Sequence, residues 1–110
     1  MKITNLTKNK VIVEDAKEPK SFLARTVGLI GAKAPYPLIL NTRFGIHTFG
    51  VRFPMDVVIV DKENKVAATR ENLLANRVFF WNPLFEKVIE LPQGTIEKAQ
   101  ISVGDEVSFT

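Results

Sequence analysis

The sequence has no cysteine among its 110 residues, which excludes disulfide bonds, cysteine–zinc sites and thiol catalysis. It has no apolar run near the roughly 20 residues that a membrane-spanning helix requires, since its long runs, such as Val57–Val60, are short. It has a single histidine, whereas metal sites usually combine several histidine or cysteine ligands. It also has no cluster of adjacent basic residues, which nucleic-acid surfaces usually contain. We therefore expect no cofactor, no metal, no membrane span and no specific nucleic-acid partner.

The length and composition are those of one small globular domain spanning residues 1–110. The apolar content is 45%, the charged content is 25%, and the net charge of +3 is dispersed along the chain. The segment Met1–Leu6 lacks the apolar stretch of a secretory signal peptide. We expect a soluble, cytoplasmic protein.

Strand patterns dominate the chain and are separated by short polar turns. One such turn is Asp61–Lys65, and turns of this length join antiparallel strands because parallel strands need long crossovers. Pro19 is suited to the first turn of a helix, and apolar residues at helical spacing follow it as far as Ile30. A single helical turn is expected over 95–100. Strands are predicted over 2–6, 10–14, 38–40, 46–53, 55–60, 66–69, 87–91 and 106–109.

These patterns predict a mainly β protein of the α+β class. The expected architecture is a compact antiparallel β-barrel or a jelly-roll-like sandwich. One helix is expected near residues 19–30.

Three blocks in the sequence resemble a known family. They are Phe22–Gly31, Phe53–Asp61, and Val88–Ile96 followed by Val103–Val107. In this order they are similar to the signature blocks of the domain of unknown function 192 family. The resemblance implies a small β-rich barrel or jelly-roll-like fold with one helix and no established activity. Many members carry a Trp–Met–x–Asn–Thr run where this chain has His47–Val51.

Arg52 and Asp56 are ionisable groups beside an apolar strand, and such groups need a structural or functional reason. If 46–56 is one extended segment, both face the side opposite His47. The functional interpretation is a clamp for an anion or a carbonyl, with Arg25 as a further ligand-binding candidate. The structural interpretation is an ion pair, or an Asp56 that accepts hydrogen bonds from backbone amides.

His47, Asp56 and Glu90 are the candidate catalytic residues. The imidazole of His47 suits a general base, or it packs in the core or lies at the surface. A His47–Asp56 dyad requires a bulge at Pro54 that reverses the facing of the residues beyond it. Glu90 lies within an apolar strand, where it is a second acid for Asp56, faces solvent, or pairs with an arginine such as Arg52.

The aromatic run Val78–Phe85 is consistent with a contact surface or with core packing, and core packing is the favoured interpretation in so small a chain.

Two functions compete. The leading hypothesis is an accessory or binding module whose site around Arg52 and Asp56 takes a small polar or anionic ligand or a protein partner. The alternative is a small hydrolytic or isomerising enzyme that uses His47, Asp56 and Glu90. The enzyme requires these side chains to converge in one pocket. The sequence leaves the ligand and the oligomeric state open.

Overall fold

The computed structural model describes residues 1–19, 34–43 and 45–110. The body of the helix predicted near residues 19–30 and the candidate Arg25 lie outside the described residues. Within them, strands predominate and a single short helix, α2 (Thr95–Lys98), is present. None of the helical structure described is long and apolar enough to cross a membrane.

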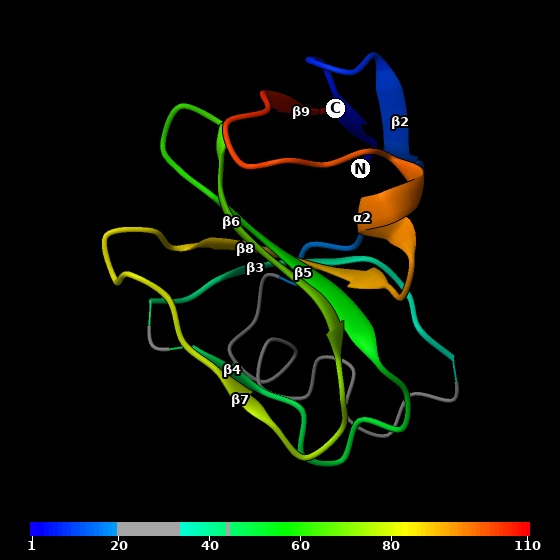
Figure 1. Ribbon diagram of the computed structural model, residues 1–110, viewed down its shortest axis with the longest axis vertical. Helices are drawn as coiled ribbons and strands as arrows, with labels where there is room; N and C mark the ends of the chain where they lie inside the picture. Colours follow the sequence, from blue (N-terminus) through cyan, green and yellow to red (C-terminus); the bar gives the residue numbers. More distant parts are fainter. Residues whose placement is uncertain (20–33, 44) are drawn as a thin grey trace.

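A four-stranded sheet occupies the middle of the molecule (Figure 1). Every neighbouring pair of strands in it is antiparallel, as short connections dictate. Its strands lie in the order β3 (Leu38–Asn41), β8 (Lys87–Pro92), β5 (Met55–Val60) and β6 (Val66–Leu73).

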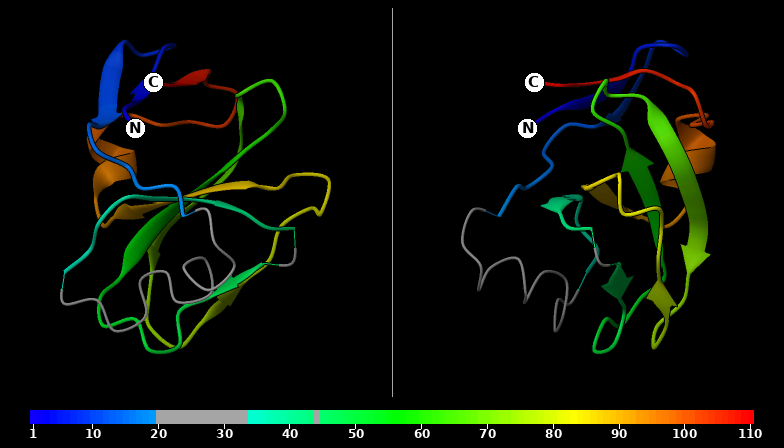
Figure 2. Two further views of the ribbon diagram at one scale, coloured as in Figure 1. Left: turned by 180° about the vertical axis from the view of Figure 1, so that it is seen from behind. Right: turned by 90° about the vertical axis from the view of Figure 1, so that its left-hand side faces the viewer.

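Smaller sheets lie at the two ends of this central sheet. The one beside both chain termini has the order β2 (Lys10–Val13), β1 (Ile3–Asn5) and β9 (Val107–Phe109). A two-stranded ribbon of β4 (Ile46–His47) and β7 (Val78–Phe79) lies at the opposite end of the molecule, far from both termini (Figures 1 and 2).

Strand β5 is buried along its whole length because both faces of the central sheet are covered. Successive side chains in a strand point to opposite faces. Val58 and Val60 therefore pack in one core with α2 and the terminal sheet. Val57 and Ile59 pack in a second core, which includes the inner side of the ribbon. The central sheet separates these two cores.

The mainly β, antiparallel prediction is confirmed, and the sandwich is the correct member of the predicted pair. The described strands form separate sheets rather than a closed barrel. The predicted strand over 46–53 is wrong beyond His47, because the chain leaves β4 there and turns at Thr48–Gly50. Thr48 is buried, and its hydroxyl donates to the carbonyl of Leu74 at 2.7 Å and accepts from the N–H of Arg77 at 2.8 Å.

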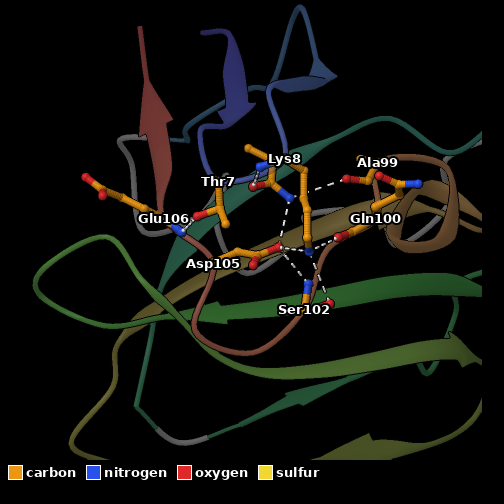
Figure 3. A network of polar contacts seen from close by, with 8 residues as sticks. Thr7, Lys8, Ala99, Gln100, Ser102, Asp105 and Glu106 are labelled. Atoms are coloured by element: carbon orange, nitrogen blue, oxygen red, sulfur yellow. Dashed lines mark hydrogen bonds and ion pairs between the residues drawn. The ribbon is translucent and has the colours of Figure 1, made fainter.

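A buried polar network joins the terminal sheet to the segment after α2 (Figure 3). Oδ2 of Asp105 accepts hydrogen bonds from Lys8 Nζ at 2.9 Å, from Asn5 Nδ2 at 3.0 Å and from Ser102 N–H at 3.0 Å. Burial alone would raise the pKa of Asp105, but these bonds and the charge of Lys8 together lower the pKa below its ordinary value. The network is satisfied within the fold and has a structural role.

Candidate functional site

Asp56 is an internal hydrogen-bond acceptor of the fold. Its side chain is 1% exposed. Oδ1 accepts a hydrogen bond from the N–H of Asn72 at 3.0 Å, and Oδ2 accepts one from the N–H of Ile96 at 2.9 Å. The interpretation in which Asp56 accepts bonds from backbone amides is therefore confirmed. Among the described residues no ion pair joins Arg52 to Asp56.

The contacts of Asp56 explain why a carboxylate lies near the start of the buried strand β5. Helix α2 begins after Gly94, which has a φ of 89° and gives the helix no side-chain cap. The first turn of a helix leaves N–H groups without partners inside the helix. Asp56, on strand β5, accepts the hydrogen bond of one of these groups, the N–H of Ile96. The Phe53–Asp61 block and the Val88–Ile96 block, which both carry the family resemblance, thus meet through the hydrogen bond from the N–H of Ile96 to Asp56.

Glu90 lies on the opposite face of the central sheet from Asp56. Its neighbours across the strands are Leu38 and Val57, which belong to the core beside the ribbon. Asp56 is paired with Leu91, which belongs to the other core. The two carboxylates therefore do not form the acid pair that the enzyme hypothesis requires.

The environment of Glu90 is apolar. The residue is 6% exposed, and among the described residues it makes no ion pair. Desolvation disfavours its charged form, so burial raises the pKa of Glu90 to about 7. The expectation of a solvent-facing glutamate is therefore wrong, and among the described residues no arginine pairs with Glu90. Arg25, the other arginine considered as its partner, lies outside the described residues.

His47 is exposed at the end of β4. Its cross-strand partner is Val78, itself 53% exposed. The imidazole stacks on the ring of Phe49, with 5.4 Å between ring centroids. His47 is therefore a surface residue on the outer side of the ribbon, and the expectation that it shares one extended segment with Asp56 is wrong.

The four candidates that the structure describes do not converge. Asp56 faces the core beside α2, Glu90 faces the core beside the ribbon, and His47 and Arg52 are exposed. A hollow of about 210 Å³ lies where the β5–β6 turn meets the β7–β8 loop, and none of the four lines it. No group of three or more metal-binding side chains occurs in the described part of the chain.

The aromatic run Val78–Phe85 is divided between core and surface. Phe79, Trp81 and Phe85 pack against the core beside the ribbon. Phe80 is 68% exposed. The structure thus shows core packing for Phe79, Trp81 and Phe85, whereas Phe80 faces the surface, as expected where an extended chain points successive side chains to opposite sides.

An exposed apolar surface covers the outer side of the ribbon; we call it the ribbon patch. His47 and Val78 are paired across the ribbon, and Phe49 stacks on His47. The bond from Thr48 to the carbonyl of Leu74 brings Leu74 beside the same turn. The ribbon patch comprises His47, Phe49, Leu74, Val78 and Phe80.

Sequence reasoning missed the ribbon patch because β7 was not predicted as a strand. The available signal was the run of β-branched and aromatic residues Val78, Phe79 and Phe80, together with the turn-forming Asn76 that precedes them. The pairing of β7 with β4 is a contact between distant parts of the chain, and local patterns do not reveal it.

The absence of a side chain at Gly45 leaves room for the Phe80 ring of the ribbon patch. Gly45 has a φ of +89°, and a Cβ at this position would lie 2.5 Å from Cδ1 of Phe80. We expect Gly45→Ala to displace this ring and to destabilise the fold by about 1–2 kcal/mol, since alanine is strained in this conformation. Thermal unfolding measures the loss, and Gly104→Ala is the control, because its φ is +95° and its Cβ would meet nothing within 4 Å. Equal losses in the two variants would show that the Phe80 contact contributes nothing.

The fold and site define a small two-core β protein of the sandwich type, in which the carboxylate of Asp56 near the start of β5 is structural. The chain belongs to the DUF192 family, described as uncharacterized, which it matches over residues 4–109. It is 29% identical to UPF0127 protein PF1050 of Pyrococcus furiosus, over 96% of this chain and 95% of that protein.

Two solved structures share the fold. A protein of unknown function from Novosphingobium aromaticivorans matches with a TM-score of 0.81 and 14% identity, over 98% of this chain and 82% of that chain. A Sinorhizobium meliloti protein matches with a TM-score of 0.76 and 12% identity, over 97% of this chain and 89% of that chain. Likeness at this level of identity concerns the fold alone.

Proposed function

We propose that this protein is a non-catalytic binding module that contacts a protein partner through the ribbon patch. One observation carries the proposal. The candidate catalytic groups are far from convergent, because Asp56 and Glu90 are buried on opposite faces of the central sheet and His47 is at the surface, whereas exposed aromatic and aliphatic side chains gather at one end of the fold.

The composition of the ribbon patch supports a contact surface. Contiguous exposed apolar groups on a small protein usually mark an interaction site, and aromatic residues and arginine are enriched at protein interfaces. Arg52 and Arg77 are both exposed, and they belong to the turn after β4 and the loop before β7. Of the polar site first expected around Arg52 and Asp56, Arg52 is the member available to a partner.

The alternative enzyme receives no support from this geometry. General acid–base catalysis needs groups within hydrogen-bond reach of one substrate, and Asp56 already accepts bonds from two backbone amides.

We keep the cytoplasm as the expected location, in keeping with a cysteine-free chain.

The proposal is tested by placing a benzophenone photocrosslinking residue at position 80 in the cell that makes the protein. We expect one recurrent protein adduct, because a bound partner covers this position. The matched control carries the same residue at Val103, which is 64% exposed and lies outside the ribbon patch. The absence of a position-specific adduct would contradict the proposal.

A further inference from the structure

The segments that build the ribbon and its loops carry charge of one sign. Residues 42–55 and 72–85 contain no aspartate or glutamate, although the chain has 12 of these residues. The same segments contain Arg43, Arg52, Arg77 and His47. The two segments that carry the exposed apolar side chains therefore supply arginine and no carboxylate of their own.

Two of the three arginines are not neutralised. Arg43 pairs with Glu86, with 3.0 Å between Nη2 and Oε2. Within the described residues Arg52 makes no ion pair, and the guanidinium of Arg77 donates only to the carbonyl oxygens of Ala75 and Asn76, at 3.3 and 3.4 Å. Both guanidinium groups are left for an external anion.

We propose that the ribbon patch docks an acidic protein segment that carries apolar side chains. This inference rests on the proposed function and specifies the partner. The apolar side chains of the segment would pack on Phe49, Val78 and Phe80. Its carboxylates would pair with Arg52 and Arg77, since guanidinium groups bind carboxylates in a bidentate manner.

Charge complementarity disfavours two other occupants. A two-fold contact with a second copy brings the same surface of both copies together, so it would place unpaired arginines near one another. Single-stranded nucleic acid binds aromatic platforms along a positively charged groove. Here two ribbon-patch residues, Leu74 and Val78, are aliphatic, and two un-neutralised arginines do not make such a groove.

Fluorescence anisotropy with synthetic probes tests the charge of the partner. The main probe is a labelled peptide in which Asp and Glu alternate with Leu and Phe. The comparison probes are the same peptide with Lys in place of the acids, the same peptide with Ser in place of Leu and Phe, and an oligothymidylate. We expect the acidic apolar peptide to bind most tightly of the four probes, and we expect its affinity to fall as the salt concentration increases.

Substitutions then connect binding to the ribbon patch. We expect Arg52→Gln and Arg77→Gln each to weaken the binding of the acidic apolar peptide by about 5- to 10-fold, because each removes one charged contact. Because Arg77 contacts its own loop, Arg77→Lys serves as a second variant that keeps the charge. Lys10→Gln removes an exposed charge on β2, in the sheet beside the termini, and is expected to change the affinity less than 2-fold.

The outcomes separate this inference from the proposed function. The proposal of an acidic partner is overturned if the lysine peptide or the oligothymidylate binds more tightly than the acidic apolar peptide through the same arginines. It is also overturned if the chain dimerises through the ribbon patch. The segment crosslinked to position 80 provides a second reading, because mapping it by mass spectrometry should give an acidic sequence. A basic or neutral crosslinked segment, or no binding by any probe, overturns the inference and leaves the binding module in place. A missing adduct overturns both.

Discussion

Replacing Asp56 with alanine is expected to lower the free energy of unfolding by about 2–4 kcal/mol, because two backbone donors lose their acceptor. The N–H of Ile96 loses its bond inside the fold, and the N–H of Asn72 loses a part-buried bond at the irregular end of β6. Asp56 is 1% exposed, so water does not replace the acceptor of Ile96. Chemical denaturation with circular dichroism measures the loss.

Asp61 provides a matched control for this prediction. Its carboxylate also accepts two backbone hydrogen bonds, from Glu63 and Lys65, each at 2.9 Å. These bonds lie in an exposed turn, where water competes for the same donors, so Asp61→Ala is expected to cost about 1 kcal/mol or less. Similar losses in the two variants would contradict the view that burial makes the Asp56 bonds important. An Asp56→Ala protein as stable as the parent would remove its structural role altogether.

Strand positions were predictable from the sequence where local chemistry determines them. Met55–Val60 is an uninterrupted apolar strand apart from Asp56, and the structure confirms its bounds. The hairpin that follows was predictable because the polar residues Asp61–Lys65 favour a turn. The strands of the terminal sheet were predictable for the same reason: short alternating runs are separated by Thr7–Asn9.

The arrangement of the site was not predictable in the same way. Whether Asp56 and Glu90 meet depends on the register of β5 against β8 and on which core covers each face. Both are contacts between distant parts of the chain, and a shift of one residue would reverse the face of each side chain. The turn after His47 depends on the hydrogen bond that the Thr48 hydroxyl donates to the carbonyl of Leu74 and on the one that it accepts from the N–H of Arg77. Alternation within 46–56 carries no information about them.

The Glu90→Gln variant is expected to be more stable than the parent above neutral pH, by about 3 kcal/mol. In the folded protein burial raises the pKa of Glu90 to about 7, whereas an unfolded glutamate ionises near pH 4.3. Between these values the folded state keeps a proton that the unfolded state has released, so the stability of the parent falls as pH rises through this window. Glutamine resembles the protonated carboxyl in shape and does not ionise, so it avoids this loss.

The pH dependence of the difference distinguishes this cause from a change in packing. The two proteins should be equally stable near pH 3, where Glu90 is protonated in both states, and should diverge until about pH 7. Other ionisable groups are present in both proteins, so their contributions cancel in the difference. Glu71→Gln is the control for removing a carboxyl group, because Glu71 is exposed on β6, and we expect it to change the stability by less than about 0.5 kcal/mol. A flat difference for Glu90→Gln, or a parent that is the more stable at pH 8, would show that the ionised carboxylate has a compensating partner in the folded protein.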